Sequence, residues 1–164
     1  KIISLKGRNK NHFFSLLFKD LDMLDYFFSI SELEKKIIDK FLPGKLSILL
    51  LPKNKNMFYN NFIGLDDKIS CRISSDNFNK EIYKKIDFPI VSTSANISGK
   101  KNLFNISDII DTFEESLDFI VDYGDIGYSK GSTILNVNND GLNLIRDGDI
   151  QFETIIKELN YGKS

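Results

Sequence analysis

The chain of 164 residues has no tryptophan, one cysteine, one histidine and three prolines. A single cysteine, Cys71, excludes an intramolecular disulfide framework and a cysteine-based zinc cluster. Because His12 is the only histidine, the chain lacks the residues for a histidine-rich metal site, and a Ser-His-Asp triad could use only His12. The longest apolar stretch, around Leu46 to Leu51, is far below the roughly 18 residues that a membrane span needs.

Neither sign of charge is in large excess, because the formal net charge is −1 and the isoelectric point is about 5.9. No global field therefore favours DNA or an acidic membrane as a partner. No signal peptide is visible where the chain opens Lys-Ile-Ile-Ser, so we expect a cytoplasmic protein. The hydrophobic fraction of 41%, with 14 phenylalanines and 6 tyrosines, excludes disorder and suffices for the core of one domain.

Arginine is scarce, since only Arg8, Arg72 and Arg146 occur among 22 basic residues. Lysine serves wherever a simple positive charge is enough. Arginine is the better residue where a planar, permanently charged fork must bind a carboxylate or a phosphate. We therefore treat the three arginines as candidate anion ligands, with chance survival or a surface ion pair as the alternative.

The pattern of apolar residues predicts a mixture of helices and strands. Strands are expected at residues 13–18, 46–51, 68–74, 89–92, 117–121, 133–137 and 142–146, the last two joined by the turn Asn139-Asp140-Gly141. Helices are expected at residues 20–28, 31–41, 76–85, 107–113 and 151–159, the second with a capping box of Ser31 and Glu34. Because helices and strands do not alternate strictly, the order favours an α/β fold with an open mixed sheet over a barrel or a doubly wound fold.

Two segments carry residues suited to binding. Lys6, Arg8 and Lys10 alternate just before the first expected strand, which predicts a site for a polyanion such as nucleotide phosphates; a solvated basic turn is the alternative. The segment 92–99 brings small hydroxyl and amide side chains to the end of a strand, where a ligand can approach the backbone; an ordinary serine-rich turn is the alternative. A nucleophilic serine is disfavoured, because His12 alone would have to act as its base.

Three further features lie on or near strands. The order Lys130-Gly131-Ser132 is not that of a P-loop, so what remains is a loop that brings Ser132 to the start of a strand. Arg72 lies inside an apolar strand and must face either solvent or a cavity that holds an anion. Arg146 ends a strand before a turn.

The order of these motifs resembles the YrdC-like family of threonylcarbamoyl-AMP synthases. The matching motifs run in order through Lys-x-Arg, Leu-Pro-Gly, x-Arg-Ile, Pro-Ile-Val-Ser-Thr-Ser-Ala-Asn-Ile-Ser-Gly, Gly-Ser-Thr-Ile-Leu and Ile-Arg-x-Gly. The resemblance implies an open twisted α/β sheet with flanking helices around a positively lined cavity. It also implies synthesis of L-threonylcarbamoyl-AMP from L-threonine, bicarbonate and ATP, with release of pyrophosphate, as the first step of N6-threonylcarbamoyladenosine formation at position 37 of tRNA.

Roles for individual residues follow from the resemblance. It implies catalytic roles for Lys6, Arg8, Ser94 and Asn96. It implies ATP contacts for Arg8, Lys68, Ser94, Asn102 and Arg146, and threonine contacts for Arg72, Ser92 and Ser132. The expected reactants are L-threonine, bicarbonate and ATP, with Mg²⁺ held by the nucleotide and no metal held by the protein. Weak binding of tRNA or double-stranded RNA, a downstream threonylcarbamoyl-transferase complex and no membrane association are expected as well.

Two departures from the family pattern affect this interpretation. The family begins with a strand and a Pro-Thr-Asp-Thr-Tyr-Gly-Leu-type segment that these residues do not contain, so we expect one domain over residues 1–164 without its N-terminal strand and helix. Asn9 replaces the usual proline, and the following His-Phe-Phe-Ser-Leu-Leu is similar to a paralogous branch. An RNA- or tRNA-binding module, or an inactive paralogue of the same fold, is therefore the alternative function.

Overall fold

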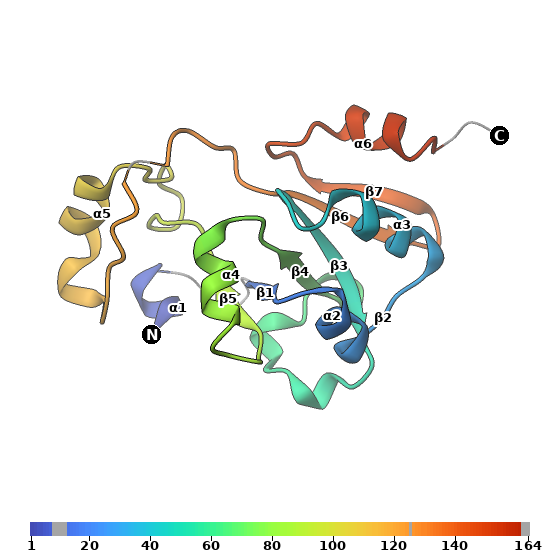
Figure 1. Cartoon of the computed structure of the whole chain (residues 1–164), viewed down its shortest axis with the longest axis horizontal. Coiled ribbons are helices and arrows are strands. Elements are labelled where there is room, and N and C mark those ends of the chain that lie inside the picture. Colours follow the sequence, from blue (N-terminus) through green and yellow to red (C-terminus); the bar gives the residue numbers. More distant parts are fainter. Residues whose placement is uncertain (8–12, 125, 162–164) are drawn as a thin grey trace. The chain divides into compact units, whose positions relative to one another are not determined.

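The structure is a computed structural model that describes residues 1–7, 13–124 and 126–161 (Figure 1). The chain divides into two compact units. The first unit consists of Lys1–His12 and Thr93–Ser129, and the second of Phe13–Ser92 and Lys130–Ser164. The expectation of one domain over residues 1–164 stays a prediction.

The second unit is built on a mixed sheet. Its strands are β1 (Ser15–Phe18), β2 (Phe28–Ser29), β3 (Leu46–Pro52), β4 (Ile69–Ile73), β5 (Ile90–Ser92), β6 (Thr133–Asn138) and β7 (Gly141–Arg146). Six of them follow the order β5-β1-β4-β3-β6-β7, and β2 pairs with β3. The β1–β4 and β3–β6 pairs are parallel and the others antiparallel. Since β5 and β7 form the two edges of this order, the sheet is open, and the predicted mixed α/β class is confirmed.

The helices described in this unit are α2 (Leu21–Phe27), α3 (Glu32–Phe41), α4 (Asn77–Tyr83) and α6 (Phe152–Glu158). Of these four helices, α6 has no side-chain cap and the other three begin at one. The predicted capping box is present, because Ser31 N donates to Glu34 Oε2 at 2.8 Å and Glu34 N donates to Ser31 Oγ at 3.3 Å. Short 3₁₀ turns at Lys55–Met57, Asn60–Phe62 and Leu65–Asp67 lead into β4. No helix in the described ranges has the length and apolar character to cross a membrane.

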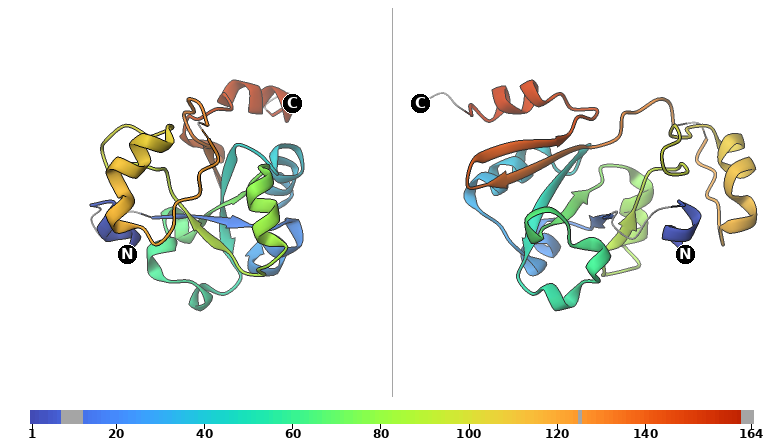
Figure 2. Two further views of the ribbon diagram at one scale, coloured as in Figure 1. Left: turned by 60° about the vertical axis from the view of Figure 1, so that its left-hand side comes forward. Right: turned by 180° about the vertical axis from the view of Figure 1, so that it is seen from behind.

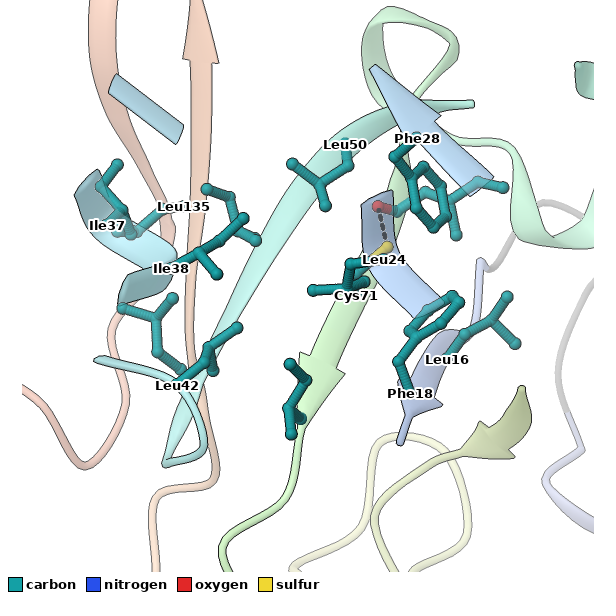
Figure 3. Packing of buried hydrophobic residues seen from close by; sticks show 14 of the residues in the cluster. Leu16, Phe18, Leu24, Phe28, Ile37, Ile38, Leu42, Leu50, Cys71 and Leu135 are labelled. Carbon is teal, nitrogen blue, oxygen red and sulfur yellow. Dashed lines mark hydrogen bonds between the residues drawn. The ribbon is translucent and has the colours of Figure 1, made fainter. Parts of the chain in front are cut away.

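The hydrophobic core lies on one face of the sheet, here called the core face. Alternate residues of each strand point into it, among them Leu16, Ile48, Cys71 and Leu135. Helices α2, α3 and α6 cover this face, and their core side chains are Met23, Leu24, Ile37, Ile38 and Ile155. Figure 3 shows ten of the packed residues by name. Burial raises the pKa of the Cys71 thiol well above its ordinary value, which fits its predicted role as a small core residue.

The C-terminal part of the second unit folds as a hairpin followed by a helix. The turn at Asn139-Asp140-Gly141 joins β6 and β7 as predicted, and Gly141 has a φ of +109°. Helix α6 lies along this hairpin in both Figure 1 and Figure 2. The Tyr161 hydroxyl beyond α6 accepts from Leu142 N at 3.0 Å, which ties the chain end to β7.

The first unit contains α1 (Ile2–Leu5), α5 (Ile106–Phe113) and a 3₁₀ turn (Glu114–Ser116), visible in Figure 2. Helix α5 starts one residue before the predicted start at Ser107. The predicted strand at residues 117–121 is wrong, because this segment is irregular. Its apolar residues suit a strand, but a strand also requires a hydrogen-bonded neighbour, and no described strand pairs with it.

Candidate functional site

Three of the predicted catalytic residues meet in the first unit. Lys6 follows α1, is 3% exposed, and directs its ammonium group at the segment after β5. Lys6 Nζ donates to Ser94 O and to Asn96 Oδ1, both at 2.6 Å. Ser94 Oγ donates to the same Asn96 oxygen at 2.7 Å. These acceptors are neutral oxygens, and together they orient the ammonium group.

The loop that carries Ser94 and Asn96 is fixed by bonds to its own backbone and to Lys6. Ser98 N donates to Lys6 O at 3.0 Å, and Asn96 Nδ2 donates to Lys100 O at 2.7 Å. The bond from Leu103 N to Ala95 O, 2.8 Å long, folds the chain back on itself. Asn102, a predicted ATP ligand, lies next to that returning residue and is half-buried. The loop therefore brings Asn102 to the same part of the unit as Asn96.

The remaining residue of the Lys-x-Arg motif, Arg8, lies outside the described residues. The same holds for His12 and for Lys10, the third cation of the predicted basic segment. Their roles stay predictions from the sequence.

Arg72 lies on the second unit's sheet, on the face opposite the core, here called the second face. Its neighbours on β4, Cys71 and Ile73, are buried in the core, whereas Arg72 is half-buried. Its Nε donates to Gly44 O at 2.8 Å, and within the described chain no acceptor is hydrogen-bonded to its two terminal nitrogens. The side chain is thus oriented by one bond while the outer part of its fork is available for a carboxylate.

The charges around Arg72 partly oppose one another. Desolvation by burial lowers the pKa of Arg72, and the nearby positive charge of Arg146 lowers it as well. Asp76 and Asp149 act in the opposite direction. Both guanidinium groups stay charged at neutral pH. The like charges of Arg72 and Arg146 together favour binding of an anion. The positively lined cavity that the resemblance implies stays a prediction.

Arg146 and Ser132 form a second oriented group. Arg146 Nε and Nη2 both donate to Ser132 O, at 3.0 and 2.5 Å, and Nη2 also donates to Ser132 Oγ at 3.0 Å. Ser132 Oγ lies 2.9 Å from Ser47 Oγ and is buried. The side chain of Arg146 is exposed overall, although desolvation of its inner part lowers its pKa. Arg146 is therefore held in one orientation at the start of β6.

Close backbone approach at Gly148 makes this arrangement possible. A Cβ atom on Gly148 would lie 2.3 Å from Thr133 N and 2.6 Å from Gly131 O. Asp149 follows, accepts from Lys130 N at 2.7 Å and forms an ion pair with Lys45 at 2.7 Å. The glycine thus lets the turn after β7 pack directly on the segment that carries Ser132.

Ser92 joins two serines that sequence reasoning did not single out. The register pairs Ser15 with Ser92 on one side and with Ser70 on the other. Ser15 Oγ lies 2.8 Å from Ser70 Oγ. Ser47 was missed too. Ser15 and Ser47 are polar residues within the apolar runs 13–18 and 46–51, and this was the available signal in the sequence. Only the strand register shows which serines become neighbours.

Lys68 is placed differently from the other predicted ATP ligands. Its ammonium donates to Glu34 Oε1 at 3.0 Å and to the Val137 carbonyl oxygen, and both charged side chains of the ion pair are largely buried. The backbone of Lys68 is also engaged, because its N–H donates to Leu65 O and its carbonyl accepts from Gly64 N. The side chain thus serves a buried ion pair at the start of β4, four residues before Arg72.

Comparison with known proteins places this arrangement in a family. The profile of the Sua5, YciO and YrdC proteins, described as "Telomere recombination", matches residues 1–148. The chain belongs to the Sua5/YciO/YrdC family. A relative from Methanocaldococcus jannaschii, named putative threonylcarbamoyl-AMP synthase, is 33% identical over 157 residues, which are 96% of this chain and 72% of the relative. The Wigglesworthia glossinidia brevipalpis threonylcarbamoyl-AMP synthase is 31% identical, over 90% of this chain and 75% of its own length.

The fold of the Sua5/YciO/YrdC family is also seen among solved structures. P. abyssi Sua5 complexed with L-threonine superposes with a TM-score of 0.85 at 24% identity, over 95% of this chain. This chain spans 46% of that Sua5 chain. The likeness confirms the fold that the sequence motifs implied.

Proposed function

We propose that this chain synthesises L-threonylcarbamoyl-AMP from L-threonine, bicarbonate and ATP. In the first step the threonine nitrogen attacks the bicarbonate carbon and water leaves, which gives a carbamate. A carbamate oxygen then attacks the α-phosphorus of ATP and pyrophosphate leaves. Neither step needs a covalent bond to the protein, so positioning and charge stabilisation can supply the catalysis.

The observation that carries the proposal is the Lys6–Ser94–Asn96 cluster, in which Lys6 and Asn96 are buried. The Lys6 ammonium is held in a fixed position by Ser94 O and Asn96 Oδ1, both at 2.6 Å. Charge of this kind stabilises the negative charge that grows on phosphate oxygens during nucleotidyl transfer. Membership of a family whose relatives are named threonylcarbamoyl-AMP synthase supports the same reaction.

The other predicted residues supply the remaining contacts of the proposal. Arg72 binds the threonine carboxylate through the outer part of its fork, with Ser92 and Ser132 as neutral partners of the amino acid. Arg8, Asn102 and Arg146 bind ATP. Lys68 contributes to ATP binding through its backbone and not through its side chain, because its ammonium is bonded to Glu34.

Magnesium enters the proposal with the nucleotide. Mg²⁺ prefers phosphate and carboxylate oxygens and keeps several water ligands. The described residues contain no group of three or more His, Cys, Asp or Glu side chains suited to a metal ion. The adenylate product is then consumed by a transferase that modifies tRNA, and a cytoplasmic location stays a prediction.

The test is pyrophosphate release from Mg-ATP, with threonine and bicarbonate omitted in turn. We expect release only when both are present, and a fall of about 100-fold or more in Lys6→Met, since the variant loses a charged donor at the reacting phosphates. Lys101→Met, which changes an exposed lysine of the same unit, is the matched control. Release that ignores threonine, or a normal rate in the folded Lys6 variant, contradicts the proposal; RNA binding without any release favours the alternative function.

A further inference from the structure

Three serine hydroxyls lie in a row across neighbouring strands β5, β1 and β4. The row consists of Ser92, Ser15 and Ser70, here called the hydroxyl row. All three are half-buried. Directly opposed residues of adjacent strands have Cβ atoms about 5 Å apart, so the row forms a continuous polar strip on the second face.

The Ser15–Ser70 pair has unused hydrogen-bonding capacity. Its two hydroxyl oxygens lie 2.8 Å apart, and within the described chain neither has another hydrogen bond. Each serine hydroxyl offers one donor and two acceptor positions. The mutual bond consumes one proton, so one donor and several lone pairs remain for a ligand. Because the pair is uncharged, it suits a neutral group that both donates and accepts, such as an alcohol.

The hydroxyl row lies next to the guanidinium of the proposed threonine site. Ser70 and Arg72 point to the same face of β4 and are two residues apart, about 7 Å along the strand. Ser92, at the end of the row, is one of the residues already proposed to contact threonine. A ligand with a carboxylate near Arg72 therefore has its uncharged end close to the Ser15–Ser70 pair.

From this geometry we propose that Ser15 and Ser70 are specificity-determining residues that bind the side-chain hydroxyl of the amino-acid substrate. The inference rests on the proposed function and deepens it. The pair favours β-hydroxy amino acids over analogues of the same shape that lack the hydroxyl. Discrimination arises because the alcohol can form hydrogen bonds with the pair, whereas an apolar side chain desolvates the pair without a bond in return.

The test compares L-threonine with L-2-aminobutyrate, which differs by the missing hydroxyl. The quantity measured is the ratio of kcat/KM for the two amino acids in pyrophosphate release by the whole chain. We expect wild type to prefer threonine and the double variant Ser15→Ala/Ser70→Ala to lose about tenfold of that preference, the worth of roughly one hydrogen bond. Asn143→Ala is the matched control, because it removes another cross-strand polar bond, from Asn143 Nδ2 to Asn138 Oδ1.

The outcomes separate this inference from the proposed function. A double variant that loses rate equally with both amino acids shows a purely structural link between β1 and β4 and overturns the inference. An unchanged ratio in a stable double variant overturns it as well. A wild-type chain that neither binds threonine by calorimetry nor uses it overturns the proposed function and the inference together.

Discussion

On β4, Ile69, Cys71 and Ile73 are buried in the core, whereas Ser70 and Arg72 between them are half-buried and hydrogen-bonded. One strand thus contributes to two environments through its alternation of side chains. Apolar groups on the core face are stabilised by removal from water and by close packing. Polar groups on the second face each require a partner, and the partner is either another protein group or a ligand.

The two faces of the sheet in the second unit therefore differ in what stabilises their side chains. The core face also receives the apolar side chains of α2, α3 and α6. The second face carries Ser47, Ser70 and Arg72, which are hydrogen-bonded to Ser132, Ser15 and the Gly44 carbonyl, respectively. Substitution on the core face should therefore change the free energy of unfolding, whereas substitution on the second face should change substrate use.

The largest effect is expected from Phe18→Ala. Phe18 is fully buried, and the centroid of its ring lies 5.3 Å from the ring centroid of Phe28 in an edge-on contact. We expect a loss of about 3–5 kcal/mol in the free energy of unfolding, measured by urea denaturation, because the deletion leaves a cavity. The control is Phe13→Ala, since Phe13 lies in the same segment but is 52% exposed. Equal losses of unfolding free energy in the two variants would contradict the expectation that burial of the phenylalanine ring determines the loss.

The next effect is expected on the second face, from Arg72→Ala. We expect kcat/KM for threonine to fall about 100-fold, because a charge-assisted fork to the carboxylate is lost. Stability should change by only about 1 kcal/mol, the worth of the bond to Gly44 O. Arg72→Lys keeps the charge and loses the fork, so it should restore part of the rate. A variant that unfolds while its residual folded fraction works normally would assign Arg72 to the core instead.

The smallest effect is expected where α4 meets β1. Tyr83 Oη donates to Leu17 O at 2.6 Å, and burial raises the pKa of Tyr83 to about 12. A pKa above the unfolded value of about 10 means that this stabilisation is complete below pH 10 and is lost as the pH rises towards 12. Tyr83→Phe should cost about 1 kcal/mol at neutral pH. The stability difference between wild type and variant should shrink between pH 10 and 12, and parallel pH curves would contradict this.

Local features of the fold were predictable from short stretches of sequence. The Ser31–Glu34 capping box, the turn before Gly141 and the apolar run of β3 each depend on residues close together in the chain. The strand wrongly predicted at residues 117–121 shows the limit of such local patterns. A strand depends on a distant neighbour for its hydrogen bonds, and side-chain type alone does not supply one.

The candidate site was predictable in residue identity more than in arrangement. Motifs in the sequence indicate Lys6, Ser94 and Asn96, and the structure brings these three together. A motif also indicates Lys68, but its ammonium forms a buried ion pair with Glu34 on α3, and no local sequence pattern indicates that partner.

Motifs, caps and apolar periodicity act over a few residues, so the amino-acid sequence is sufficient to indicate the family, the mixed α/β class and most element positions. Which polar residues share a face and a partner depends on the tertiary structure. Ser15, Ser70 and Ser92 lie far apart in the chain and form one row only through the register of three strands. Register is set by the packing of the whole sheet, and a shift of one residue would turn every side chain of a strand to the other face.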